Sequence, residues 1–279
     1  MGWKEQGRLA LAVLVLCAGQ AAASPDRIRF LEGPAALTKL SPEQQSGKVE
    51  GYLTPGDISA IAATVPPPPA LGSSADKADT ELFQQIHRGA SAERWKVARD
   101  DDATVYLRFT DQLGFTLDRE TTPALVALLN RIAADTFAVA GEAKANTPRL
   151  RPYQVSPLKR VCGLDPVPAP DPKAKGTGYP SGHASIAWST ALVLVEAVPA
   201  SAQAIIGRAV SYGNSRVVCG LHFPADVEAG HFIGSAVIAA AFKRPDFVRD
   251  LQCARREVEA IGRGEKAADL PACSLAPVP

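Results

Sequence analysis

The sequence has almost no surplus of charge of either sign. It contains 30 lysine and arginine residues against 29 aspartate and glutamate residues, a formal net charge of +1 at pH 7. Proteins that bind nucleic acid polymers or anionic membrane surfaces usually carry a clear excess of basic residues. The balance therefore argues against a partner of either kind.

The spacings that are typical of metal sites are also missing. The chain has four histidines and five cysteines, and none of them form a CxxC or HxxxH pattern. Such close pairs supply the ligands of many zinc sites. The acidic run Asp100–Asp102 could suggest a metal cluster, but we interpret it as exposed charge at a helix end. We therefore expect no metal ion in the protein.

His87 has no partner at a useful spacing and is interpreted as a surface or core histidine. His231 is interpreted as a surface histidine.

Long hydrophobic runs are lacking as well. The apolar run 232–242 is shorter than the roughly 20 residues that a membrane-spanning helix needs. The other apolar run, 9–18, follows Lys4 and Arg8 and precedes three alanines, 21–23. This order is that of a secretory signal peptide cleaved after residue 23. We expect no membrane association after cleavage, and 28 residues of each charge sign remain.

Two other readings of the N-terminus are weaker. A membrane anchor would need a longer apolar run. A lipoprotein would be attached through Cys17, but the preceding Leu16 is too large for the usual lipid-attachment site. The protein is therefore predicted to be periplasmic or secreted.

No internal repeat and no convincing strand pattern occurs, whereas helical periodicity is frequent. The sequence predicts one all-α domain, a helical bundle over residues 75–262. A proline-rich arm (24–74), irregular in structure, precedes it and a loose tail (263–279) follows. The arm is either a disordered leader or an ordered segment packed over the helices. Residues 24–49 could be disordered or ordered. A long helix is expected after Thr122, with a buried stripe of Leu125, Leu128, Leu129, Ile132, Phe137 and Val139. Further helices are expected at 183–197, 201–217, 225–242 and 246–262.

The segment Tyr179-Pro180-Ser181-Gly182-His183 lies between a proline- and glycine-rich loop and an apolar helix. Backbone amides at a helix N-terminus lack partners within the helix, and the helix dipole favours an anion there. Gly182 permits close approach of a ligand, Ser181 adds a hydroxyl and His183 adds a group that exchanges protons near neutral pH. The segment could cradle phosphate, although by itself Ser-Gly-His is more often a simple helix cap.

Two flanking segments favour the phosphate cradle. Upstream, Lys144 is followed after six residues by Arg151-Pro152. Downstream, Ser215-Arg216 is followed after five residues by His222 and after three more by Asp226. The two arginines can each grip two phosphate oxygens, and the lysine adds a point charge. An aspartate four residues after a histidine can orient its ring.

These three segments resemble the three-part signature of the type 2 phosphatidic acid phosphatase superfamily, which includes the vanadium haloperoxidases. The best match within it is the class A bacterial non-specific acid phosphatases. Residues 52–54 through 65–69, and 215–222 with their flanks, also look like that family, and the similarity covers about residues 50–260. One branch of the superfamily comprises multi-span lipid phosphatases, but this chain lacks such a set of spans.

The resemblance implies a mechanism. His222 would attack phosphorus and form a phosphohistidine, and Asp226 would accept the other ring N–H. His183 would protonate the leaving oxygen and later activate water. Lys144, Arg151 and Arg216, together with the backbone N–H groups of Ser181 and Gly182, would bind phosphate. Since three cations replace a divalent metal, we expect activity without a cofactor, with vanadate as an inhibitor.

Export and the resemblance together bear on the cysteines. Four remain after signal cleavage, and an even number in an exported chain suggests disulfides. If the first and third motifs meet at one site, Cys162 and Cys219 are neighbours. Cys253 and Cys273 would then staple the C-terminal tail.

The substrates are expected to be small phosphate monoesters, such as nucleotides, sugar phosphates or aryl phosphates. Transfer of phosphate to an alcohol needs no further residue. The family often forms homo-oligomers. A vanadium-dependent haloperoxidase and a non-catalytic phosphate-binding protein remain alternatives.

Overall fold

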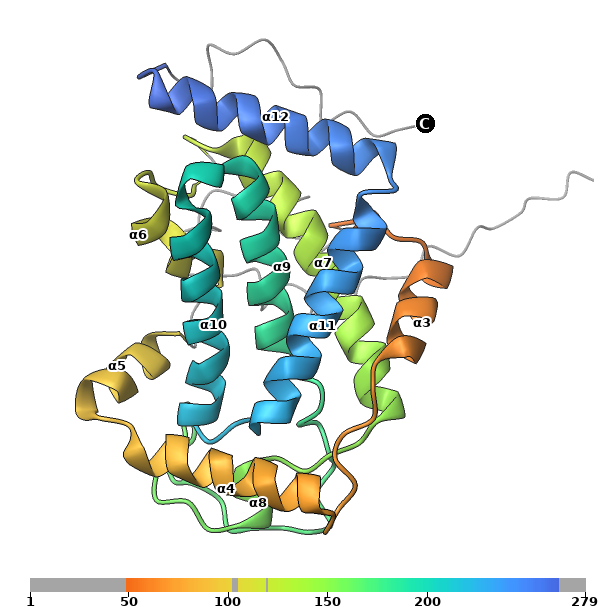
Figure 1. Cartoon of the computed structure of the whole chain (residues 1–279), viewed down its shortest axis with the longest axis vertical. Coiled ribbons are helices and arrows are strands. Elements are labelled where there is room, and N and C mark those ends of the chain that lie inside the picture. Colours follow the sequence, from red (N-terminus) through yellow and green to blue (C-terminus); the bar gives the residue numbers. More distant parts are fainter. Residues whose placement is uncertain (1–48, 102–104, 119, 266–279) are drawn as a thin grey trace, which may run out of the picture.

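The computed structural model describes residues 49–101, 105–118 and 120–265. Helices α7 (Pro123–Asn146), α9 (Gly182–Ala197), α10 (Ala202–Val218) and α11 (Pro224–Ala241) run side by side (Figure 1). Helix α12 (Pro245–Gly262) crosses one end of this group, and α4 (Ser74–Gly89) and α8 (Pro152–Val155) lie across the other end. No strand is assigned in the described ranges, so the all-α prediction is confirmed.

The predicted helices begin and end within a residue or two of the observed ones. Prolines stand at the first position of α7, α11 and α12. Proline suits this position because its fixed φ fits a helix and its missing N–H would have no partner there. The turn η2 (Pro199–Ser201) separates α9 from α10, as Pro199 indicates.

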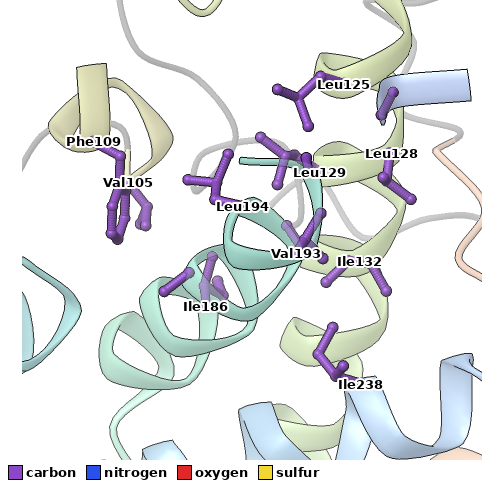
Figure 2. Packing of buried hydrophobic residues seen from close by; sticks show 14 of the residues in the cluster. Val105, Phe109, Leu125, Leu128, Leu129, Ile132, Ile186, Val193, Leu194 and Ile238 are labelled. Carbon is purple, nitrogen blue, oxygen red and sulfur yellow. The ribbon is translucent and has the colours of Figure 1, made fainter. Parts of the chain in front are cut away.

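The core lies where α7 packs against α9 (Figure 2). Three leucines and Ile132 of α7 pack in one cluster with Ile186, Val193 and Leu194 of α9 and with Ile238 of α11. The predicted stripe of α7 is buried except at Phe137, which is half-buried. Within the described residues α7 is the one single helix long and apolar enough to cross a membrane, and 72% of its apolar window is buried inside the bundle.

Glycines let α11 approach the start of α9 closely. A Cβ atom on Gly230 would lie 2.8 Å from the carbonyl oxygen of Ser181, and one on Gly234 would lie 2.9 Å from that of Ser185. Real Cβ atoms do not come this near to backbone oxygen, so both positions need glycine. The close approach brings the beginning of α9 beside the beginning of α11.

The arm that precedes the bundle is not irregular throughout, because it contains α3 (Pro55–Thr64). The side chain of Thr54 accepts a hydrogen bond from the Asp57 amide, while the Asp57 carboxylate accepts one from the Thr54 amide at 2.9 Å. This capping box offsets the weak helix propensity of the proline and glycine that follow Thr54. The described part of the arm is ordered and packs on α7 and α11.

A buried carboxylate fastens the start of the arm. Asp135 of α7 accepts hydrogen bonds from the amides of Tyr52 (2.7 Å) and Leu53 (3.2 Å). Gly51 lies so close that a Cβ there would overlap the Asp135 carboxylate. The arm is therefore fixed to the bundle by hydrogen bonds as well as by apolar contact.

Smaller helices complete the fold: α4 (Ser74–Gly89), α5 (Ala92–Asp100), η1 (Tyr106–Phe109), α6 (Thr110–Leu113) and α8 (Pro152–Val155). The buried stripe of α4 is Asp79, Phe83 and His87. His87 is a core residue, since its Nδ1 lies 2.9 Å from the Val218 carbonyl oxygen and its ring stacks on Phe83.

The interpretation of the triple aspartate as exposed charge is wrong for Asp101, which is fully buried. Its carboxylate pairs with Arg108 (3.1 Å) and Arg208, and it accepts a hydrogen bond from the Ser215 hydroxyl at 2.6 Å. The Asp100 side chain is 42% exposed and pairs with Lys96 on the surface, in line with the expectation. Asp101 is buried because Arg208 and Ser215 of α10 contact its carboxylate. Among the described residues, Asp100 makes no such contact with α10 and pairs with Lys96 of its own helix.

The disulfide between Cys162 and Cys219 is present as predicted. It ties the long loop after α8 to the end of α10, and the Cys162 amide also donates to the Cys219 carbonyl at 3.1 Å. Cys253 is buried on α12. Cys273, the signal peptide and residues 24–48 lie outside the described residues, so those expectations stay predictions.

Candidate active site

The three predicted motifs meet at the end of the bundle covered by α4 and α8. Lys144 comes from the last turn of α7, Ser181 caps α9 and Asp226 lies in the first turn of α11. The Ser181 amide donates to the Asp226 carbonyl at 2.8 Å, and an Nη1 atom of Arg151 lies 3.3 Å from Nε2 of His222. Segments that are far apart in sequence therefore form one site.

Ser181 is both a helix cap and part of the cradle. Its side chain accepts a hydrogen bond from the Ala184 amide at 3.3 Å, so Ser181 is the N-cap of α9. Its own amide is engaged by Asp226, so the prediction that this N–H group binds phosphate is wrong. The Ser181 hydroxyl proton can still donate. Gly182 and His183 occupy the first turn of α9, where amides have no partner within the helix.

Lys144 is held by the loop that leads into the cradle. Its ammonium group donates to the carbonyl oxygens of Thr177 (2.9 Å) and Pro180. Burial, together with the neighbouring Arg151 charge, lowers the pKa of Lys144 to about 7. The group is therefore protonated at acid pH, where it contributes a positive charge to the site.

The two arginines of the site are fixed by backbone oxygens. Arg151 donates to the carbonyls of Leu221 (3.1 Å) and Thr177 (3.3 Å). Arg216 is fully buried and donates to the carbonyl of Asp101 at 3.2 Å. Carbonyl partners orient the guanidinium group of Arg151 without cancelling its charge, which suits this group to bind an anion.

The His222 ring lies between the carboxylate of Asp226 and the guanidinium group of Arg151. Its Nδ1 is 3.4 Å from Oδ2 of Asp226, and its Nε2 faces Arg151. That Asp226 oxygen also accepts the Phe223 amide at 2.8 Å. An Nδ1–H directed at the carboxylate leaves Nε2 with its lone pair, which is the arrangement that a nucleophile needs.

The pKa values of both histidines are lowered well below the ordinary value. Burial is the main cause for each, and the charges of Arg216, Arg151 and Lys144 add to it for His183. For His222 the charges of Arg151 and Lys144 follow burial. Both shifts favour the neutral form of the rings.

Asp226 is fully buried, and burial raises the pKa of its carboxyl to about 6, although a nearby arginine counteracts the rise. That arginine is Arg149, which sequence reasoning missed. It lies two residues before Arg151, and its Nη1 is 2.8 Å from Oδ1 of Asp226. The sequence offered one signal for Arg149: it is a third cation of the first motif, within the six residues that separate Lys144 from Arg151.

His231 does not join the site. It is half-buried on α11, and its ring stacks on Trp188 at 4.3 Å between centroids. Across the described ranges, no three acidic, histidine or cysteine side chains lie close enough together to hold a metal ion.

Comparison with known proteins agrees with the motifs. Residues 124–249 match the family model described as the PAP2 superfamily. An acid phosphatase of Zymomonas mobilis subsp. mobilis is 35% identical over 201 residues, which cover 69% of this chain and 73% of that protein. Non-specific acid phosphatases of Providencia stuartii and Salmonella typhimurium are 31% and 30% identical, over 74% and 75% of this chain and 84% of each relative.

The fold, the three converging motifs and these similarities agree with one another. The chain therefore belongs to the PAP2 superfamily and, within it, to the non-specific acid phosphatases, as the resemblance to their class A predicted.

Proposed function

We propose that the protein is an exported acid phosphatase that hydrolyses phosphate monoesters through a phosphohistidine at His222. The observation that carries this proposal is the placement of the His222 ring. One nitrogen lies 3.4 Å from the Asp226 carboxylate and the other lies 3.3 Å from Arg151. The names of the related acid phosphatases support the reaction class.

In the first step, Nε2 of His222 attacks phosphorus as the bond from phosphorus to the ester oxygen breaks. His183 transfers a proton to that oxygen, and the alcohol leaves. In the second step, water attacks the phosphohistidine, His183 accepts a water proton, and the nitrogen–phosphorus bond breaks. Inorganic phosphate leaves and both histidines return to their starting state.

The charges of the site suit these steps. Lys144, Arg151 and Arg216 neutralise the phosphoryl oxygens, and the first amides of α9 add neutral donors. The bound dianion offsets the cations and raises the pKa of His183, which can then act as an acid. Three cations also repel a divalent ion, which supports activity without a metal cofactor.

The proposed substrate range is broad. The residues of the three motifs grip phosphate, and none of them is assigned to the alcohol part of the ester. Nucleotides, sugar phosphates and aryl phosphates are all candidate substrates. An alcohol that replaces water in the second step would receive the phosphate, so phosphotransfer is part of the proposal.

Export is supported by the predicted signal peptide and by the Cys162–Cys219 disulfide, since such bonds persist in oxidising compartments. The relatives with the same activity are bacterial, which favours the periplasm. A homo-oligomer stays a prediction that the family resemblance alone supports.

The test is an assay of the purified mature chain on p-nitrophenyl phosphate at acid pH with EDTA, with and without vanadate. We expect activity that survives EDTA and is blocked by vanadate. A folded sample without activity would contradict the proposal. A following assay for bound vanadium and halide oxidation would then separate a haloperoxidase from a phosphate-binding protein.

A further inference from the structure

We propose that Arg149 is a positioning residue that fixes the Asp226 carboxylate against His222 and anchors it to α4. This inference rests on the proposed function, in which Asp226 orients the nucleophile. Arg149 is outside the set of phosphate-binding residues that the motifs identify, and its role follows from contacts in the folded protein.

The guanidinium group of Arg149 bridges two elements. Its Nη1 is 2.8 Å from Oδ1 of Asp226 on α11, and its Nη2 is 2.8 Å from Oδ2 of Asp79 on α4. Asp76, one turn earlier on α4, lies 3.3 Å from the same Nη2. The group also stacks over the Phe223 ring at 4.3 Å. Both terminal nitrogens are thus bound to carboxylates, so Arg149 is not arranged to bind phosphate.

The two oxygens of the Asp226 carboxylate have different partners. Oδ1 is held by Arg149, while Oδ2 accepts the Phe223 amide at 2.8 Å and faces Nδ1 of His222. A carboxylate whose two oxygens each accept a hydrogen bond is restrained from rotating away from the histidine. Arg149 therefore acts on the reaction through the orientation of Asp226.

The α4 end of the bridge is itself attached to the site. Oδ1 of Asp79 accepts the amide of Ala225, which immediately precedes Asp226, at 2.9 Å. One carboxylate of α4 thus holds both the arginine and the backbone beside Asp226. The residues of α4 precede the range 124–249 that matches the family model, so the motifs gave no sign of this support.

Charge gives the bridge a measurable signature. The ionisable groups that interact with Asp226 come from every neighbouring segment: Arg149, Arg151, Lys144, Asp79, Tyr179 and His222. Arg149 favours the ionised carboxylate, whereas Asp79 disfavours it. Replacing the arginine should therefore raise the pKa of Asp226, and replacing Asp79 should lower it.

The test compares Arg149→Met, Arg149→Lys and Asp79→Asn with the wild type in profiles of kcat and kcat/KM from pH 4 to 8. We expect Arg149→Met to reduce kcat at least about tenfold at acid pH, because the orienting carboxylate is freed. We expect the acid limb of kcat/KM to move up by about one pH unit, which lets activity recover partly as pH rises. KM and inhibition by inorganic phosphate should stay within about twofold, since no phosphate ligand is lost.

The other two variants sharpen the result. Arg149→Lys keeps the charge but loses the bridge, so its acid limb should stay near that of the wild type while kcat falls. Asp79→Asn should move the acid limb to lower pH, opposite to Arg149→Met. Opposite shifts are not expected from a residue that only stabilises the fold, and Asp79→Asn serves as the test if Arg149→Met does not fold.

Arg131 provides a matched control. It also pairs with two carboxylates, Asp250 (2.8 Å) and Asp246 (2.9 Å), and stacks over a ring, that of Tyr52, at 3.7 Å. It lies on α7 against α12, outside the site. Arg131→Met should lower the melting temperature without changing the pH profile.

Three results would overturn the inference. A weaker inhibition by phosphate with unchanged kcat in Arg149→Met would make Arg149 a phosphate ligand. A pH profile identical to that of Arg131→Met would make its role purely structural, as would shifts of the same sign in Arg149→Met and Asp79→Asn. Failure of the proposed function is a separate result, because the wild type would then form no phosphohistidine at all.

Discussion

At the residue scale, the proposed chemistry centres on His222. Asp226 lies on one side of its ring, and Arg151 lies on the other. In the proposed mechanism the ring has two separable roles: Nε2 attacks phosphorus, and Nδ1 orients the ring. The two roles predict unequal effects for the two residues.

Replacing His222 with alanine should abolish turnover and leave the fold intact. Asp226→Asn should cost less, because orientation weakens but attack survives. Steady-state rates on p-nitrophenyl phosphate, with circular dichroism as a check of folding, measure both. His231→Ala is the control, since this histidine stacks on Trp188 outside the site and should keep its activity.

Wild-type-like rates in His222→Ala would refute the nucleophile assignment. Equal losses from the two variants would indicate that His222 and Asp226 act as one coupled unit, in which orientation cannot be separated from attack.

The two active-site histidines should also differ from the free side chain in their titration. Burial and the surrounding cations lower the pKa of His183 and His222, so both rings should be neutral at pH 6 in the empty enzyme. NMR titration of histidine ring protons measures this, and inorganic phosphate should raise the pKa of His183. Titration of His222 at or above 6.5 in the empty enzyme would contradict the account.

The same shifts make stability depend on pH. A folded-state pKa below the unfolded value means that the unfolded chain binds more protons as pH falls. The contribution of these two histidines to folding stability is therefore present above pH 6.5 and declines as pH falls below it.

Helix packing controls the geometry of the site at the scale of elements. Gly230 of α11 contacts the carbonyl of Ser181, and Arg216 of α10 is held by the carbonyl of Asp101 at the end of α5. Each contact joins a site residue to an element from another part of the chain. Each also offers a substitution with a matched control.

Gly230→Ala should disturb the cradle, because the new Cβ would lie 2.8 Å from the Ser181 oxygen and 3.0 Å from the Ser185 amide nitrogen. We expect a loss of stability of about 1–3 kcal/mol, as is typical of overpacking, and a clear loss of activity. Thermal unfolding and kinetics measure the two effects. Gly207→Ala on α10 is the control, since nothing lies within 4 Å of its Cβ and alanine there should stabilise the helix by about 1 kcal/mol. A fully active Gly230→Ala would show that the cradle tolerates movement of α9.

Asp101→Asn should raise KM more than it lowers kcat. The buried carboxylate holds two arginines and Ser215, and its loosening would release the carbonyl that orients Arg216. We also expect a loss of about 2 kcal/mol of stability from the unpaired polar groups. Asp100→Asn is the control, because its ion pair with Lys96 is exposed and contributes little. Equal KM values for the two variants would refute the link between Asp101 and Arg216.

The sequence sufficed for the long helices and for the motif residues, because periodicity, prolines and motif spacing are local signals. It failed where a residue depends on distant partners. Asp101 is buried because its partners come from other elements, Arg108 from η1 and Arg208 from α10. Arg149 matters because it joins Asp79 of α4 to Asp226 of α11. Helix α3 is a different case, since its capping box at Thr54 and Asp57 is local and was available to inspection.

The whole molecule brings together elements from most of the described chain. The arm is fastened through Asp135, α4 supports Asp226 and α5 supports Arg216. The disulfide ties the loop of the first motif to the helix of the third. The matched family range of 124–249 thus contains the chemistry, while earlier segments support it.

Capture of the phosphoenzyme tests the central claim most directly. The enzyme would be mixed with a monoester carrying labelled phosphate, quenched in alkali, where phosphohistidine survives, and digested for peptide mapping. The account predicts label on His222 in the wild type. It predicts more label in His183→Ala with p-nitrophenyl phosphate, since that leaving group needs no acid but dephosphorylation needs the base. Continued turnover with no label, or with label on another residue, would contradict it.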